Sequence, residues 1–269
     1  MAMMAGSPCR DIPMTDSPST DTPIDTSFAG QVVLINGATG ALGTATAQTL
    51  AARGATVILL GRKLDQLDRL ADDINQRVLP EVPAEVRGEP PVIQPVDFSG
   101  AAPEDYATLV EGIERAFGRL DLLVHAMGTA GELAPLAQAD LMKFQESLHV
   151  NLTAPFALTR SAWPLLERAS RPRVLFFTDR GTDAYGSAHD IAHAGIERMI
   201  RQWAAETPRV WITGFDPGAV NSRLRHARFP GELTQDRQPP CAVMPALLDW
   251  LEHGESGAIQ RLDEAPASA

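Results

Sequence analysis

The chain has 269 residues, of which 44% are hydrophobic and 21% charged, and its formal net charge is −11 at pH 7. This length and composition predict one α/β domain with a sizeable core, and the negative charge makes nucleic acids and anionic membrane surfaces poor partners. Cys9 and Cys241 are too few and too far apart for a disulfide framework. The sequence has neither an apolar run of roughly 18 to 20 residues nor a signal peptide pattern, so we expect a soluble cytoplasmic protein.

Residues 1–28 contain four prolines among Ser, Thr and Asp, with almost no apolar side chains, which predicts a disordered tail. Residues 264–269 predict a second, short tail. Between them, residues 29–263 alternate short β-branched runs with longer amphipathic runs. Strands are predicted over 31–36, 56–60, 92–96, 120–125, 174–178, 210–215 and 258–262, and helices over 41–53, 64–78, 103–117, 141–168 and 187–206. This order predicts a single Rossmann-like domain with a doubly wound parallel β-sheet whose strands are buried on both faces.

Three glycines, Gly37, Gly40 and Gly43, occupy the turn between the first predicted strand and the first predicted helix. Glycine allows a tight turn and lets backbone N–H groups approach a pyrophosphate, whose charge a helix N-terminus favours. The position of the turn therefore predicts a dinucleotide site. Glycine-rich turns of this kind also occur without ligands, which leaves a purely structural role as the alternative.

From about Gly30 to Leu262 the chain resembles the short-chain dehydrogenase/reductase family. The resemblance rests on an ordered set of motifs: NGATGALG in the first turn, Val96-Asp97-Phe98, HAMG, Asn151 in HVNLTAPF, and Asp216-Pro217-Gly218. It implies oxidoreductase activity, with hydride transfer between a nicotinamide cofactor and a carbonyl or alcohol substrate. The cofactor-binding residues that it implies are Gly37, Thr39, Gly40, Leu42, Gly43, Arg62, Lys63, Asp97, Phe98, Ala126, Gly128, His193, Pro217, Gly218, Val220 and Ser222.

The choice of cofactor depends on Arg62 and Lys63, which follow the second predicted strand. An NAD enzyme usually has an acidic residue here, which binds the ribose 2′-hydroxyl. Two cations suit the 2′-phosphate instead, so we expect NADP(H) rather than NAD(H). Alternatively, both residues simply begin a solvated helix.

The catalytic residues of the family are largely replaced in this chain. The resemblance puts His189 at the position of the catalytic tyrosine, His193 at that of the lysine, and Gly181 near that of the serine, while the asparagine remains as Asn151. An imidazole with an ordinary pKa of about 6.5 can donate a proton near neutral pH. We therefore expect an oxidoreductase with weak, altered or lost activity, and a non-catalytic NADP-binding or protein-interaction pseudoenzyme is the alternative.

Other interpretations of this region stay open. A register slipped by one turn would use Tyr185 with His189, and Thr178 or Thr182 would then replace the hydroxyl of the serine. His189 and His193 also form half of a zinc site, which His125 or His149 would have to complete. No HExxH pattern or suitably spaced carboxylate is present, so we expect no metal.

The predicted helices 141–168 and 187–206 are the pair through which family members commonly dimerise. Their apolar residues Phe156, Trp163 and Trp203 fit such an interface, which predicts a homodimer or homotetramer. By the same resemblance, Arg223, Arg225, Arg228 and Phe229 fall in the lid over the substrate, which suits an anionic or apolar substrate whose identity the sequence leaves open.

Overall fold

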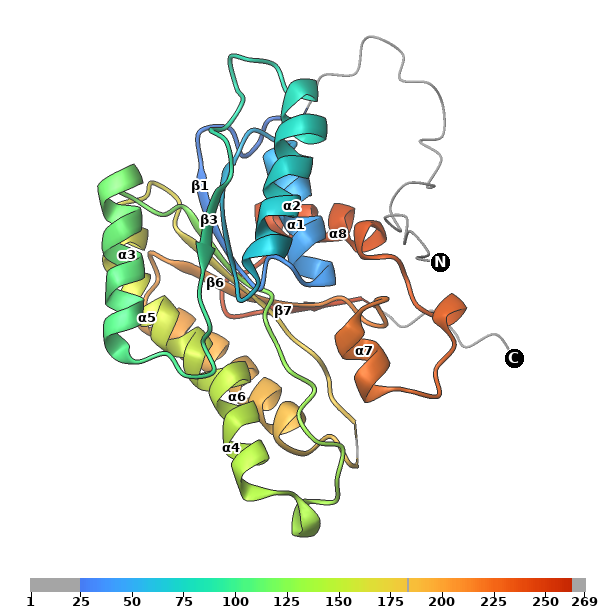
Figure 1. Ribbon diagram of the computed structural model, residues 1–269. Coiled ribbons are helices and arrows are strands. Elements are labelled where there is room, and N and C mark those ends of the chain that lie inside the picture. Colours follow the sequence, from blue (N-terminus) through green and yellow to red (C-terminus); the bar gives the residue numbers. More distant parts are fainter. Residues whose placement is uncertain (1–24, 183, 263–269) are drawn as a thin grey trace.

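The computed structural model describes residues 25–182 and 184–262. Seven parallel strands form one sheet in the order β3-β2-β1-β4-β5-β6-β7 (Figure 1). The strands are β1 (Val32–Asn36), β2 (Thr56–Gly61), β3 (Val92–Pro95), β4 (Leu122–His125), β5 (Arg173–Phe177), β6 (Trp211–Asp216) and β7 (Ile259–Arg261). The predicted doubly wound parallel sheet is confirmed.

Helices cover both faces of the sheet. They are α1 (Ala41–Ala51), α2 (Leu64–Asp73), α3 (Pro103–Phe117), α4 (Leu141–Leu148), α5 (Ala154–Leu166), α6 (Ser187–Glu206), α7 (Arg223–Arg228) and α8 (Met244–His253). In Figure 1, α1, α2 and α8 pack on one face, and α3, α5 and α6 pack on the other. None of these described helices is long and apolar enough to cross a membrane.

Alternate residues of the central strands enter two separate cores. In β1, Val33 and Ile35 belong to the core beneath α1, α2 and α8, whereas Val32 and Leu34 belong to the core beneath α3, α5 and α6. Successive side chains of a strand point to opposite faces, so a sheet covered by helices on both sides requires apolar residues at every position. This arrangement explains the apolar run over residues 32–35 of β1, which ends at the buried polar residue Asn36.

The predicted helix 141–168 is divided into α4 and α5 by a π-helical turn, His149–Thr153. Pro155 has no backbone N–H, so the carbonyl of Asn151 cannot receive the usual hydrogen bond from four residues ahead. The helix widens at this turn and continues beyond it. The predicted long helix is therefore helical from Leu141 to Leu166, with a π-helical turn before Pro155 that the sequence did not predict.

The predicted N-terminal tail, residues 1–28, lies mostly outside the described residues, as does the tail 264–269. Its last four residues are described and are anchored on the domain. Phe28 is fully buried, with the Arg173 guanidinium 4.9 Å from its ring centroid, and Asp25 Oδ2 lies 2.7 Å from Arg53 Nε. The folded domain therefore begins earlier than predicted, because a single aromatic residue among polar ones proves to be a core residue.

Candidate functional site

The candidate site lies where the strand order reverses, between β1 and β4. Helices that follow these two strands leave in opposite directions, which opens a crevice at the carboxyl ends of the strands. A cavity of about 360 Å³ occupies this place. Asn36 at the end of β1 and the segment 126–129 after β4 form its floor.

The glycine turn packs closely against this floor. Gly37 has a φ of +81°, and a Cβ atom there would lie 2.5 Å from the backbone nitrogen of Met127. A Cβ at Gly43 would lie 2.2 Å from the Gly37 carbonyl oxygen, so Gly43 serves the packing of α1 on the turn and does not line the cavity. No side chain caps the N-terminus of α1 at Gly40. Its first N–H groups therefore remain available to an anionic ligand, as a dinucleotide site requires.

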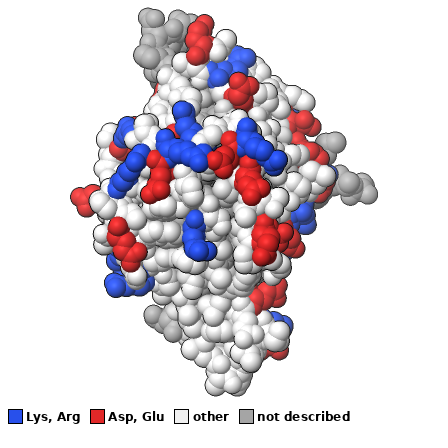
Figure 2. Space-filling model, turned by 90° about the vertical axis from the view of Figure 1, so that its left-hand side faces the viewer, with Lys and Arg blue, Asp and Glu red and all other residues white. Residues whose placement is uncertain are grey.

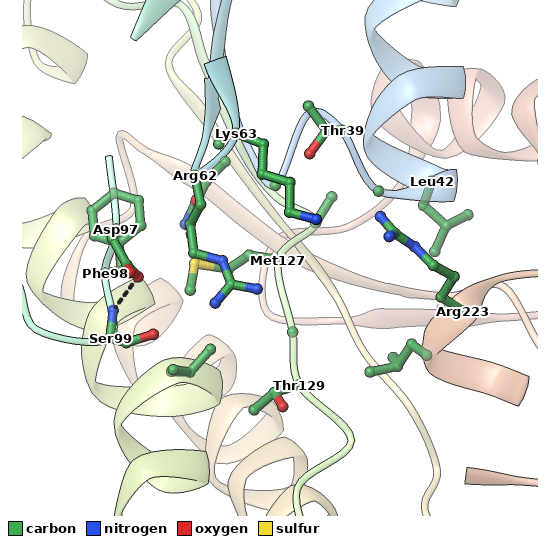
Figure 3. A pocket seen from close by; sticks show the side chains of 18 of the residues that line it. Thr39, Leu42, Arg62, Lys63, Asp97, Phe98, Ser99, Met127, Thr129 and Arg223 are labelled. Carbon is green, nitrogen blue, oxygen red and sulfur yellow. Dashed lines mark hydrogen bonds between the residues drawn. The ribbon is translucent and has the colours of Figure 1, made fainter. Parts of the chain in front are cut away.

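Cations line two opposite walls of the cavity. Arg62 and Lys63 extend into it from the end of β2, and Arg223 extends from α7 on the other side (Figure 3). Within the described chain no carboxylate forms an ion pair with any of the three, while Asp97 and Glu146 also line the cavity. The cavity thus has a cationic surplus in a chain whose formal net charge is −11.

Most of the predicted cofactor residues meet at this cavity. Those that line it are Gly37, Thr39, Gly40, Leu42, Arg62, Lys63, Asp97, Phe98, Ala126, Gly128 and Ser222. Those that do not are Gly43, His193, Pro217, Gly218 and Val220. Sequence reasoning missed several lining residues, among them Ser99, Thr129, Glu146 and Arg223. The position of Arg223, directly after the predicted cofactor residue Ser222, could have indicated that it lines the cavity. The family resemblance placed it in the substrate lid instead.

His189 and Asn151 hold the same residue of the loop after β4. The Nδ1 atom of the fully buried His189 lies 2.8 Å from the Thr129 carbonyl oxygen. Asn151 accepts a hydrogen bond from the Thr129 N–H at 2.9 Å and donates one to the Thr129 carbonyl at 3.0 Å. Because a carbonyl only accepts, His189 carries a proton on Nδ1. Its Nε2 atom is then the one that can gain or lose a proton.

The free side of His189 faces a carboxylate. His189 Nε2 lies 3.5 Å from Asp179 Oδ2, which is within ion-pair range but without a hydrogen bond. The ring of His193 stacks at a tilt on that of His189, with centroids 4.3 Å apart. The Nδ1 atom of His193 is buried and has no partner in the described part of the protein. Burial lowers the pKa of His193, and the Asp179 carboxylate opposes this shift only in part.

A buried ion pair closes the site on the α7 side. Arg228 Nη2 binds Asp190 Oδ1, and Arg228 Nη1 lies 3.8 Å from Asp179 Oδ2. The other oxygen of Asp190 accepts a hydrogen bond from the Thr182 N–H at 2.8 Å, and the Thr182 hydroxyl shares its one proton between this oxygen, at 2.9 Å, and the Ala184 carbonyl, at 2.8 Å. The Arg228 side chain is only 1% exposed. Neither His189 nor His193 lines the cavity described above, although Thr129, the partner of His189, does.

Comparison with known proteins assigns the chain to a protein family. The short chain dehydrogenase family model matches residues 31–233. The chain belongs to the short-chain dehydrogenase family. The "Uncharacterized oxidoreductase YciK" of Escherichia coli K12 is 30% identical to it over 231 residues, which cover 84% of this chain and 87% of that protein.

Two solved short-chain dehydrogenases share the fold with a TM-score of 0.81 and cover 89% of this chain and 99% of their own. One, from Shigella flexneri 2a, is 26% identical and was solved in complex with NADP. The other, from Escherichia coli CFT073, is 28% identical and was solved in complex with NADPH. The predicted family and fold class are both confirmed.

The structure of this short-chain dehydrogenase disfavours the slipped register, in which Tyr185 would be the proton donor. Tyr185 precedes α6, has a φ of +65° and exposes 63% of its surface. Gly181 has a φ of +77°, and Asp190 occupies the space that a side chain there would need, so a serine does not fit at this point. Thr182 uses its hydroxyl on Asp190, whereas the Thr178 hydroxyl, directly after β5, is buried without a partner among the described residues. Thr178 is therefore the better candidate for the missing hydroxyl.

The structure of this short-chain dehydrogenase does not assemble the zinc site considered from the sequence. His125 Nε2 lies 2.8 Å from the Thr159 hydroxyl, and His149 Nε2 lies 2.9 Å from the Phe98 carbonyl oxygen. Neither joins His189 and His193, and no group of three or more possible ligands gathers anywhere in residues 25–182 and 184–262. The two histidines of α6 thus lack the third ligand that the zinc hypothesis needs.

Proposed function

We propose that this short-chain dehydrogenase binds NADP(H) in the cavity between β1 and β4. The observation that carries the proposal is the pair of cations, Arg62 and Lys63, at the end of β2. A ribose 2′-phosphate suits two cations, whereas the 2′-hydroxyl of NAD(H) would be better bound by a carboxylate. The uncapped N-terminus of α1 fits the pyrophosphate, and the two neighbours solved with NADP and NADPH support the same cofactor.

The reaction proposed for the site is hydride transfer between this cofactor and a carbonyl or alcohol. When bound, NADPH supplies the hydride that reduces the carbonyl carbon to an alcohol. His189 gives the Nε2 proton to the carbonyl oxygen and is then reprotonated from solvent. Its Nδ1–H bond to Thr129 fixes the ring, and Asn151 fixes Thr129 in turn. The Asp179 carboxylate lies 3.5 Å from Nε2, on the side of the ring from which this proton would leave.

We expect this activity to be slow. His193 takes the place of a lysine, and its lowered pKa means that it carries little positive charge at neutral pH with which to hold the cofactor ribose. His189 is fully buried and needs a rearrangement of its surroundings before a substrate can reach Nε2.

One observation favours a second candidate function, an NADP(H)-binding protein without turnover. The Arg228–Asp190 ion pair lies between α7 and α6, and the cavity does not extend to either histidine. In this alternative the cofactor site works as a binding site or supports a protein interaction, and the region around His189 is structural.

Titration with NADPH and NADH, followed by nicotinamide fluorescence, tests the cofactor proposal. We expect tighter binding of NADPH and loss of this preference in Arg62→Glu. Gly37→Asp would be a poor probe, because its side chain would strike the backbone at Met127. No binding of either nucleotide would refute a nicotinamide cofactor.

A screen of carbonyl and alcohol substrates then distinguishes the two candidate functions. If the first holds, His189→Ala removes the turnover, and His253→Ala, at an exposed histidine, leaves it unchanged. Cofactor binding with no turnover across the panel would favour the second. Equal turnover in His189→Ala and the native protein would exclude His189 as the proton donor.

We also propose a cytoplasmic homo-oligomer, a homodimer or homotetramer, that assembles through α4, α5 and α6. Phe156 and Ile191 each expose 44% of their surface on these helices, and Trp203 stacks on Trp163 and contacts Phe156 at a tilt. The end of the molecule where α4 lies also has few charges (Figure 2). Light scattering on eluted protein would give the mass directly, and a monomer at micromolar concentration would contradict the proposal.

A further inference from the structure

Helix α7 carries three arginines, and two of them have a charged partner among the described residues. Arg225 forms two hydrogen bonds with Glu232, at 2.7 and 2.8 Å, and Arg228 pairs with Asp190. Arg223 is exposed, lines the cofactor cavity and forms no ion pair with the residues that the structure describes. We propose that Arg223 binds the pyrophosphate of the dinucleotide, from the wall opposite Arg62 and Lys63. This inference rests on the proposed binding of NADP(H).

The direction of the side chain assigns Arg223 to the pyrophosphate. In Figure 3 its guanidinium lies near Leu42, in the first turn of α1, and faces the end of Lys63 across the cavity, whereas Arg62 extends from the end of β2 in another direction. A dinucleotide in this fold places its pyrophosphate at the N-terminus of α1 and its ribose 2′-oxygen near the end of β2. The two anionic groups of NADP(H) therefore meet separate cations, and Arg223 belongs to the group that NADPH and NADH share.

The charge of the cavity supports the same conclusion. Without Arg223, two cations, Arg62 and Lys63, would face two carboxylates, Asp97 and Glu146, in the cavity lining. Arg223 supplies the positive surplus, on the side where α1 presents uncapped N–H groups. A guanidinium can bind two phosphate oxygens at once, which suits a pyrophosphate held between α1 and α7.

The base of Arg223 is held firmly, so that its side chain can act as a fixed ligand. Ser222 caps α7 by accepting a hydrogen bond from the Arg225 N–H at 3.0 Å. The Asn221 N–H donates to the Gln238 carbonyl, and the Gln238 N–H donates to the Ala219 carbonyl, each at 2.8 Å. Glu232 joins Arg225 to the buried Arg237, which anchors the segment that follows α7. Binding through Arg223 therefore orders little more than its own side chain.

The test compares Arg223→Ala, Arg223→Lys and Arg62→Ala, with Arg198→Ala on the exposed surface of α6 as the matched control. The probes are NADPH, NADH, ADP-ribose, which keeps the pyrophosphate, and adenosine 2′-monophosphate, which lacks it. Affinities are measured by calorimetry on folded full-length protein, and the far-ultraviolet circular dichroism of each variant shows that it has folded.

We expect Arg223→Ala to weaken NADPH, NADH and ADP-ribose alike, by about 10- to 100-fold, the range for one charge-assisted hydrogen-bonded contact. Adenosine 2′-monophosphate should bind as before, and the preference for NADPH over NADH should not change. Arg223→Lys should recover part of the loss. Arg62→Ala should show the opposite pattern, with NADPH and adenosine 2′-monophosphate weakened and NADH retained.

Unchanged binding of NADH and ADP-ribose to a folded Arg223→Ala protein would overturn the inference. A loss confined to NADPH and adenosine 2′-monophosphate would overturn it as well, since Arg223 would then serve the 2′-phosphate. If native protein binds none of the four probes, the proposed NADP(H) site itself fails, and the inference fails with it.

Discussion

The buried ion pair between Arg228 and Asp190 gives the sharpest prediction for stability. Replacing Arg228 by methionine keeps most of the volume of the side chain but leaves the Asp190 carboxylate without its cation. The side chains of Arg228 and Asp190 are 1% and 16% exposed, so water screens their interaction poorly. We expect Arg228→Met to lower the free energy of unfolding.

The size of this loss follows from what each partner keeps. Removing one partner of a buried pair costs about 3 to 5 kcal/mol, because the other charge stays behind. Asp190 retains two hydrogen bonds from Thr182, and the native Arg228 has buried Nε and Nη1 atoms without hydrogen-bond partners among the described residues. Both facts reduce the loss, so we expect about 2 to 3 kcal/mol. Asp190→Asn should lower the free energy of unfolding by a similar amount. The double variant should lower it by clearly less than the sum of the two single decreases.

Urea unfolding followed by circular dichroism measures these values. Arg168→Met is the matched control, because Arg168 pairs with Glu114 on the surface, where the side chains are 50% and 44% exposed. Exposed pairs contribute at most about 1 kcal/mol. If Arg228→Met and Arg168→Met destabilise the protein equally, or if the double variant is additive, the argument for a strong buried pair is wrong.

Three further predictions concern the core and the glycine turn. The Thr159 hydroxyl donates to the Pro155 carbonyl and so accepts from His125 Nε2–H, and burial lowers the pKa of His125 to about 3. The unfolded chain binds this proton near pH 6.5 and the folded chain does not, so the free energy of unfolding should fall as the pH drops below about 6.5. His125→Gln should reduce the slope of this free energy against pH, measured by urea unfolding between pH 6 and 4.5, by about 1 kcal/mol per pH unit. Equal slopes in the native protein and the variant would contradict the assignment. Gly43→Ala should lower the free energy of unfolding by about 2 kcal/mol or more, because the added Cβ meets the backbone oxygen of Gly37. Gly112→Ala is the control: a Cβ there meets open space on α3, so this variant should be neutral or stabilising in the same assay. Phe28→Ala should lower the free energy of unfolding by about 3 kcal/mol or more, because the ring is fully buried. A decrease below about 1 kcal/mol would show that Phe28 is not part of the core.

The sheet and its family could be predicted from the sequence because both depend on local patterns. Strands buried on both faces give continuous apolar runs such as residues 32–35 of β1, and the glycine turn that follows marks the carboxyl end of β1. The predicted cofactor residues of this turn and of the end of β2 lie together for the same reason, since parallel strands deliver the residues that follow them to one edge of the sheet.

The surroundings of the histidines could not be predicted, because they are formed by residues far apart in the chain. His189 contacts Thr129, which lies 60 residues away, and Asp190 contacts Arg228, which lies 38 residues away. Helix α7 has only six residues, among them three arginines and a histidine, so it shows no apolar periodicity. Tertiary ion pairs stabilise it instead, and such pairs leave no periodic signal in a sequence.

The same ion pair connects stability with the proposed reaction. If a substrate reaches His189 only when Arg228 leaves Asp190, an opening that costs about 2 to 3 kcal/mol leaves roughly 0.6 to 3% of the molecules open. If the reaction proceeds through His189 and this opening limits it, Arg228→Met should raise kcat/KM on any substrate that the screen reveals, by up to about 30- to 160-fold, while it lowers the stability. A second variant, Arg168→Met, should leave kcat/KM unchanged and lower the stability by at most about 1 kcal/mol. Lower turnover in Arg228→Met, with cofactor affinity intact, would instead mean that Arg228 contacts the substrate and that the closed pair is not an obstacle to it.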